Sequence, residues 1–85
     1  MPVICTFYGI KIIMYYKDHN PPHFHVRYSG HSAIMDFSGN VINGSLPSRA
    51  VAMIRDWTRA HGSELKHNWN NARIGEPLKK IEPLD

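Results

Sequence analysis

The sequence has little of three features that would assign it to a broad class of protein. It has one cysteine, Cys5, which excludes a disulfide within the chain and is typical of a reducing cytoplasm. Its longest apolar run covers only residues 12–16, whereas a membrane-spanning helix needs ~20 apolar residues. The N-terminus has no basic leader ahead of an apolar stretch, so no signal peptide is expected. We therefore expect a cytoplasmic protein with no membrane association.

A chain of 85 residues is expected to form a single domain, residues 1–85. A domain of this size buries roughly 60–65% of the surface that its unfolded chain exposes, which leaves room for one core and a shallow site. The net charge is +3 with neutral histidines, from ten Lys and Arg against seven Asp and Glu. This modest basic balance is compatible with nucleic acid or an acidic protein as partner, and equally with a charge that only maintains solubility.

The first half of the sequence predicts strands and the second half predicts helices. Alternation, β-branched residues and short turns indicate strands at 2–7, 10–16, 23–28, 32–37 and 41–43. Helical spacing of apolar residues predicts helices over about 47–61 and 63–74, interrupted at Gly62, which suits a left-handed helix end. The predicted fold is α+β: an antiparallel four- or five-stranded meander sheet (residues ~2–43) with two C-terminal helices packed on one face.

The segment HNPPHFHV, residues 19–26, combines three histidines with two prolines. Because side chains alternate along a strand, the apolar residues of 23–28 are expected to face the helices. His23, His25 and Arg27 then face outward, onto the sheet face that the helices leave open. On the preceding strand, the apolar parity of residues 10, 12, 14 and 16 is expected to point inward. The opposite parity adds Lys11, Tyr15 and Lys17 to the open face.

The predicted basic face therefore comprises Lys11, Tyr15, Lys17, His23, His25 and Arg27. Cations with interleaved aromatic rings suit phosphate contacts and base stacking, so the face is a candidate for docking RNA or a protein partner without chemistry. A second alternative is a metal-independent ribonuclease, with His23 and His25 as general acid and general base in either order. In that mechanism Arg27 binds the non-bridging phosphate oxygens and Tyr15 stacks a base.

Two further alternatives assign the histidines other roles. His23 and His25, aided by Asp18 or His19, are potential metal ligands, but a stable site needs three or four ligands and the sequence has no Cys cluster. Too few ligands converge by this argument, so we expect no metal and no other cofactor. In the structural alternative, residues 20–22 fix the loop and the histidines hydrogen-bond to its carbonyls. Spacing alone does not separate these alternatives.

Several segments resemble the domain-of-unknown-function 4160 family of small bacterial proteins. They are Tyr8-Gly9-Ile10, Met14-Tyr15, Asp18-His19, residues 21–26 (PPHFHV), residues 44–47 (GSLP), Trp57, Asn68-Trp69, Ala72-Arg73, residues 75–78 (GEPL) and residues 81–84 (IEPL). The resemblance implies a bacterial cytoplasmic protein, often encoded beside a second small protein in a layout like a toxin–antitoxin pair. A small protein partner is therefore expected from the resemblance, and RNA is expected as a further partner from the basic face. The family has no established activity, so the resemblance implies no catalytic residues.

Overall fold

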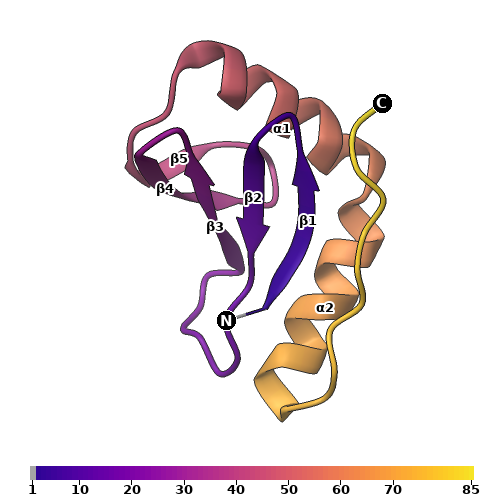
Figure 1. Cartoon of the computed structure of the whole chain (residues 1–85). Coiled ribbons are helices and arrows are strands. Elements are labelled where there is room, and N and C mark those ends of the chain that lie inside the picture. The colour runs from indigo at the N-terminus through magenta and orange to yellow at the C-terminus, as the bar shows by residue number, and fades with distance from the viewer. Residues whose placement is uncertain (1) are drawn as a thin grey trace.

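The computed structural model describes residues 2–85, which form one antiparallel sheet followed by two helices. The strands are β1 (Val3–Phe7), β2 (Ile10–Ile13), β3 (His23–Tyr28), β4 (His31–Asp36) and β5 (Val41–Gly44), and their order in the sheet is their order in the chain. The helices are α1 (Ser48–Ala60) and α2 (Gly62–Ile74), packed on one face of the sheet (Figure 1). The predicted α+β fold, a five-stranded meander with two C-terminal helices, is confirmed.

Two of the hairpins turn on a residue followed by glycine. Tyr8 and Gly9 join β1 to β2, and Ser29 and Gly30 join β3 to β4, with φ positive at all four residues. Two-residue turns with positive φ at both central positions match the right-handed twist of the strands that they connect. These turns fix the register of both hairpins, and thereby which side chains of β3 face outward.

The second strand is shorter than the sequence predicts. The pattern of residues 10–16 indicates one continuous strand, but β2 ends at Ile13. Beyond it the chain leaves the sheet toward α2, where the Lys17 backbone N–H donates to the Ala72 carbonyl at 3.0 Å and Lys17 adopts a φ of +56°. The expectation that Tyr16 points into the core is therefore wrong, and its side chain is 43% exposed.

The core lies between the inner face of the sheet and the two helices. Phe24 and Val26 of β3 are fully buried there, in one cluster with Trp57 of α1 and Trp69 of α2. The ring centroids of Phe24 and Trp57 are 6.0 Å apart in an edge-to-face arrangement, which is a favourable geometry for aromatic pairs. The alternation in 23–28 therefore correctly predicts the inward-facing residues of this strand.

The junction between the helices differs from the expected glycine end. His61, with φ −126° and ψ 25°, is the cap residue of both helices, and its backbone N–H donates to the carbonyls of Trp57 and Thr58. Gly62 is the first residue of α2 and does not take the left-handed conformation that the sequence predicts. The left-handed position falls at Gly75, where α2 ends.

One edge strand of the sheet, β1, contacts the C-terminal coil, whereas the other edge strand, β5, is exposed. Residues 76–85 form a coil that returns along α2 toward β1 (Figure 1), where the Ile81 N–H donates to the Ile4 carbonyl at 2.8 Å. The Asn68 side chain holds this coil through both the N–H and the carbonyl of Lys79. Strand β5, at the other edge, leaves Val41 and Ile42 exposed. Within residues 2–85, no helix combines the length and apolar character needed to cross a bilayer.

Candidate functional site

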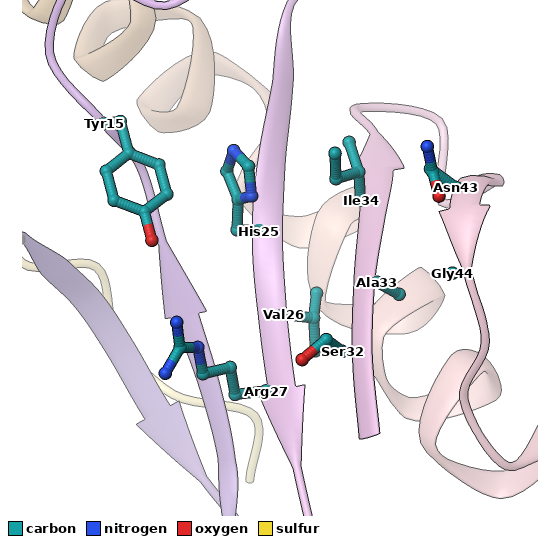
Figure 2. A pocket seen from close by; sticks show the side chains of 9 residues that line it. All are labelled: Tyr15, His25, Val26, Arg27, Ser32, Ala33, Ile34, Asn43 and Gly44. Atoms are coloured by element: carbon teal, nitrogen blue, oxygen red, sulfur yellow. The ribbon is translucent and has the colours of Figure 1, made fainter. Parts of the chain in front are cut away.

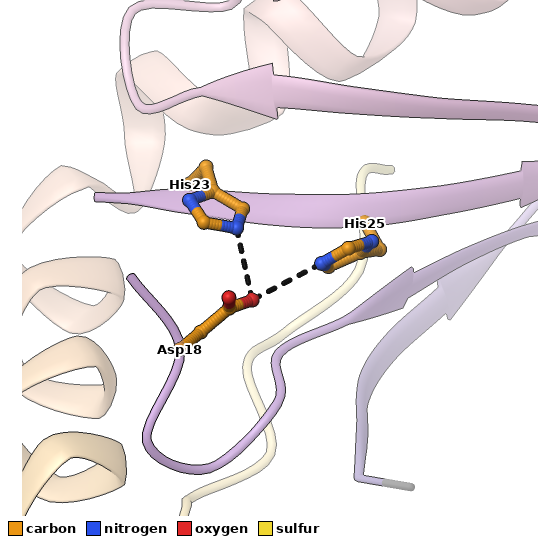
Figure 3. A group of neighbouring side chains, drawn as sticks. All are labelled: Asp18, His23 and His25. Carbon is orange, nitrogen blue, oxygen red and sulfur yellow. Dashed lines mark hydrogen bonds and ion pairs between the residues drawn. The ribbon is translucent and has the colours of Figure 1, made fainter. Parts of the chain in front are cut away.

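Asp18, His23 and His25 form a compact group at the start of β3, the Asp18 cluster (Figure 3). The two histidines are two residues apart on the strand, so their rings lie on one side of it. Asp18 reaches them from the loop between β2 and β3, and its Oδ2 atom contacts both rings. The distances are 2.9 Å to His23 Nε2 and 3.2 Å to His25 Nε2.

His23 is fixed on both sides of its ring. Its Nδ1 atom lies 2.7 Å from the Pro21 carbonyl oxygen, and its ring centroid lies 5.3 Å from that of Trp69. The prediction that His23 lies exposed on the open face is wrong, because its exposed fraction is 8%. The loop that precedes β3 is bonded to α2 through Lys17, and together they enclose this end of the strand. The contact with a loop carbonyl that the structural alternative expects is present at His23.

The Asp18 carboxyl is stabilised in its charged form despite partial burial. Burial alone raises the pKa of a carboxyl because it removes water from the charge. Here the His19 backbone N–H, 2.9 Å away, the His25 ring and the His23 ring together outweigh burial and hold the pKa of Asp18 below its ordinary value. The cluster thus places a carboxylate, not a carboxylic acid, against two imidazoles at neutral pH.

Beyond the cluster, the outer face of the sheet carries two cations side by side. Lys11 on β2 lies directly opposite Arg27 on β3, and both side chains are exposed. Opposite side chains on antiparallel strands are about 4.5–5.5 Å apart at Cβ, and like charges there destabilise the pair. Within residues 2–85, neither cation forms an ion pair. The outer face therefore contains positive charge that the fold itself leaves uncompensated.

Two open hollows flank Arg27. Figure 2 shows the first, where the His25 ring and the Arg27 guanidinium of β3 project beside the ring of Tyr15, which follows β2 in the chain. The ring centroids of Tyr15 and His25 are 4.5 Å apart, edge to face. The remaining lining residues are Val26, Ser32, Ala33, Ile34, Asn43 and Gly44. The second hollow has Lys11 and His31 in its wall, and among the described residues no Asp or Glu lines either one.

The structure therefore divides the predicted basic face into two parts. Lys11, Tyr15, His25 and Arg27 lie together on the outer face. His23 lies beside His25 but is buried in the Asp18 cluster, away from the cations, and Lys17 lies in the loop beyond β2. Ser32 and Asn43 also line the first hollow, and the sequence does not predict this because their place depends on the register of β4 and β5.

Asp18 is the residue whose importance sequence reasoning underestimates. The sequence indicates it only as an auxiliary metal ligand, yet it is the acceptor shared by both histidines. The available signal is its position five residues before His23, in a loop that must return to the sheet for β3 to begin. The premise that too few ligands converge for a metal does not hold, because Asp18 brings a third donor to the two imidazoles.

The comparisons with known proteins identify the family. The model of a domain of unknown function, DUF4160, matches residues 9–70, well over half of the chain. The chain belongs to this family. Comparisons with curated proteins and with solved structures gave no match.

The segment that matches DUF4160 contains the whole of the Asp18 cluster and the cations of the outer face. It begins after β1 and ends within α2, so the coil that covers the β1 edge lies outside it. Because the family description states no function, the chemistry of this DUF4160 chain has to be argued from these two groups of side chains.

Proposed function

We propose that the protein binds single-stranded RNA through the outer face of its sheet. The observation that carries this proposal is the pair formed by Lys11 and Arg27, two exposed cations opposite each other with no ion pair to either within residues 2–85. Their mutual repulsion costs stability, and a bound phosphate group would remove it. The guanidinium of Arg27 can bind two phosphate oxygens at once, whereas Lys11 adds a point charge.

The surroundings of Arg27 favour a polynucleotide over a simple anion. The hollow beside Arg27 contains the Tyr15 ring, packed against His25, at a place that a base stacked next to a bound phosphate would reach. Stacking on an aromatic side chain contributes about 1–3 kcal/mol per base and tolerates any sequence. Within residues 2–85, no carboxylate lines either hollow, so neither hollow would repel the negatively charged phosphate backbone of RNA.

Binding without cleavage has more support than the metal-independent ribonuclease. A general acid and a general base must both face the phosphate, but the Nε2 atoms of His23 and His25 face the Asp18 carboxylate. A phosphate placed between these rings would meet that negative charge. Cleavage therefore stands as the alternative that the binding experiment also detects.

The test is fluorescence anisotropy with a labelled single-stranded RNA, in the presence of a chelator. The salt concentration is varied from about 50 to about 200 mM. Wild-type protein is expected to bind with an affinity that falls steeply with salt, by a log–log slope of about 0.7 per phosphate contact. Arg27→Ala should weaken binding and reduce the slope. Arg59→Ala is the matched control, because it removes the same charge from a 72% exposed side chain on α1.

Equal loss in both variants, or binding that does not respond to salt, would reject the outer face as the RNA site. Gel analysis of the same samples reports any cleavage. The pH is varied from about 5 to about 8, which brackets the ordinary pKa of histidine. A bell-shaped cleavage rate that His25→Ala reduces by about 10²–10⁴-fold would instead support the ribonuclease.

We also propose that the protein binds a small protein partner. The two would form a toxin–antitoxin-like module in the bacterial cytoplasm. The specific support is β5, an edge strand with Val41 and Ile42 exposed, which offers unpaired backbone groups for strand addition. Co-expression with the product of the neighbouring gene should give a complex, which Ile42→Lys weakens and Lys66→Ala does not. A complex that Ile42→Lys leaves intact would remove β5 from the interface, and no complex by calorimetry would end the proposal.

A further inference from the structure

We propose that the Asp18 cluster is a binding site for a divalent transition-metal ion, for which Zn²⁺ is the probe. The ligands are one carboxylate oxygen of Asp18 and the Nε2 atoms of His23 and His25. All three donor atoms lie within 4.8 Å of one another, and the two distances to Asp18 Oδ2 are 2.9 and 3.2 Å. Bonds of about 2.0–2.2 Å at tetrahedral to octahedral angles place neighbouring ligand atoms about 2.9–3.5 Å apart, so the two distances from Asp18 Oδ2 to the imidazoles match edges of a coordination polyhedron.

The orientation of His23 is the second argument. The Pro21 carbonyl can only accept a hydrogen bond, so the His23 Nδ1 atom, 2.7 Å away, carries a hydrogen and donates it. When the His23 ring is neutral and its hydrogen is on Nδ1, Nε2 carries a lone pair. That lone pair points at the Asp18 carboxylate oxygen 2.9 Å away, so two acceptors face each other. A proton between them would satisfy this pair alone. A metal ion would accept lone pairs from His23, Asp18 and His25 together.

The surroundings of His23 have the form expected around a metal ligand. Ligating histidines usually donate their second ring N–H to a carbonyl or carboxylate, which fixes the tautomer and the ring orientation. The Pro21 carbonyl fills this role, and Trp69 packs against the same ring at 5.3 Å between centroids. The ring of His23 is therefore held in place before any ion arrives, which lowers the entropy cost of binding.

The donor set selects the class of ion. Two imidazoles and a carboxylate suit Zn²⁺ and similar transition metals, whereas Mg²⁺ and Ca²⁺ prefer oxygen ligands. Three protein ligands leave at least one coordination position for water or another ligand, as in catalytic and not structural zinc sites. The exposed fractions of the side chains, 10% for His23, 20% for Asp18 and 27% for His25, leave the cluster partly open to solvent.

The experiment is calorimetric titration of the full chain with Zn²⁺ at pH 7, after removal of metal by chelator, with no RNA present. One ion per chain with micromolar affinity or tighter is expected, and excess Mg²⁺ should not compete. Asp18→Asn and His25→Ala should each weaken binding by about 100-fold or more, since even the loss of an outer-shell partner costs about 10–100-fold. His67→Ala, which removes an exposed histidine of α2, is the matched control and should leave affinity unchanged.

Nitrogen-detected NMR of the imidazole rings provides an independent measurement. The ring signals of His23 and His25 should change together and be complete at one equivalent of Zn²⁺. Millimolar binding, binding to several histidines, or equal affinity in wild type and His25→Ala would overturn the proposal. Thermal unfolding checks the fold of each variant, and His25→Ala alone decides the outcome if Asp18→Asn does not fold. Because no RNA is present, the result is separate from the outcome for RNA binding.

Discussion

The two faces of β3 are built from alternate residues of one six-residue strand and have opposite properties. Phe24 and Val26 point inward and are buried by the helices. His25 and Arg27 point outward, and Arg27 lies opposite Lys11, a placement that weakens the sheet. The comparison teaches that stability and binding capacity are assigned to different faces here. Substitutions on the inner face should change the free energy of unfolding, whereas those on the outer face should change affinity for ligands.

The largest effect is expected for Phe24→Ala on the inner face. Its side chain is fully buried against Trp57 and Phe37, so its removal leaves a cavity that the aromatic cluster cannot fill. The free energy of unfolding should fall by about 3–5 kcal/mol, a large fraction of the stability of a small domain. Urea denaturation measures this loss. A loss below about 1 kcal/mol would contradict the assignment of stability to this face.

A smaller effect is expected for Asp18→Asn. Asp18 contributes both to the stability of the fold and to the proposed binding site. At pH 7 the substitution removes the charged acceptor of the His19 backbone N–H and of the His25 ring, and should cost about 1–3 kcal/mol. Because the pKa of Asp18 is lower in the folded protein than its ordinary value of 3.8, its contribution is complete well above pH 3.8. The contribution is lost as the pH falls through the lowered pKa.

The measurement for Asp18 is urea denaturation of both proteins from neutral to acidic pH. The stability difference between wild type and Asp18→Asn should narrow below pH 3.8. Asp56→Asn is the matched control, since Asp56 is 65% exposed and its ion pair with Arg59 should contribute little. A difference that stays constant with pH would show that the Asp18 charge does not contribute to folding.

The smallest effect, and one of opposite sign, is expected for Lys11→Thr on the outer face. Removal of one of two opposed cations should raise the free energy of unfolding by about 0.2–1 kcal/mol. The gain should vanish in an Arg27→Ala background, because the repulsion is then already absent. Urea denaturation of the four proteins in this cycle gives the coupling. No coupling between the two positions would mean that the cations do not repel each other, and the main support for the RNA site would be lost.

Most of the fold is readable from the sequence because it depends on local patterns. Alternation in residues 23–28, glycines at two-residue turns and helical spacing after Pro47 each act over a few residues. The end of β2 is not readable from local patterns, because the chain beyond it is held by a distant bond, from the Lys17 N–H to the Ala72 carbonyl in α2. The cap at His61 is not readable from the sequence, because the preference of glycine for left-handed ends points to Gly62, whereas the His61 N–H bonds back to Trp57 and Thr58 and Gly62 begins α2.

The site was predictable in its outer part only. Strand parity correctly grouped Lys11, His25 and Arg27, since period-two alternation decides which face a residue occupies. Parity places His23 on the same side of β3 as His25, but it does not predict that a loop and a helix from elsewhere in the chain cover this residue. It is silent about Asp18, because a loop residue has no parity and its position depends on how the chain returns to the sheet.

The coil that occupies the β1 edge has a consequence for self-association. With Ile81 bonded to Ile4, β5 is the strand among the described residues whose outer edge remains open. If two copies paired through β5, the open edge of each would be occupied by the other. The joined sheet of ten strands would then have β1, covered by the coil, at both of its edges. A contact of this kind is isologous and closes on itself. Association of the folded protein through its sheet edges is therefore expected to stop at pairs.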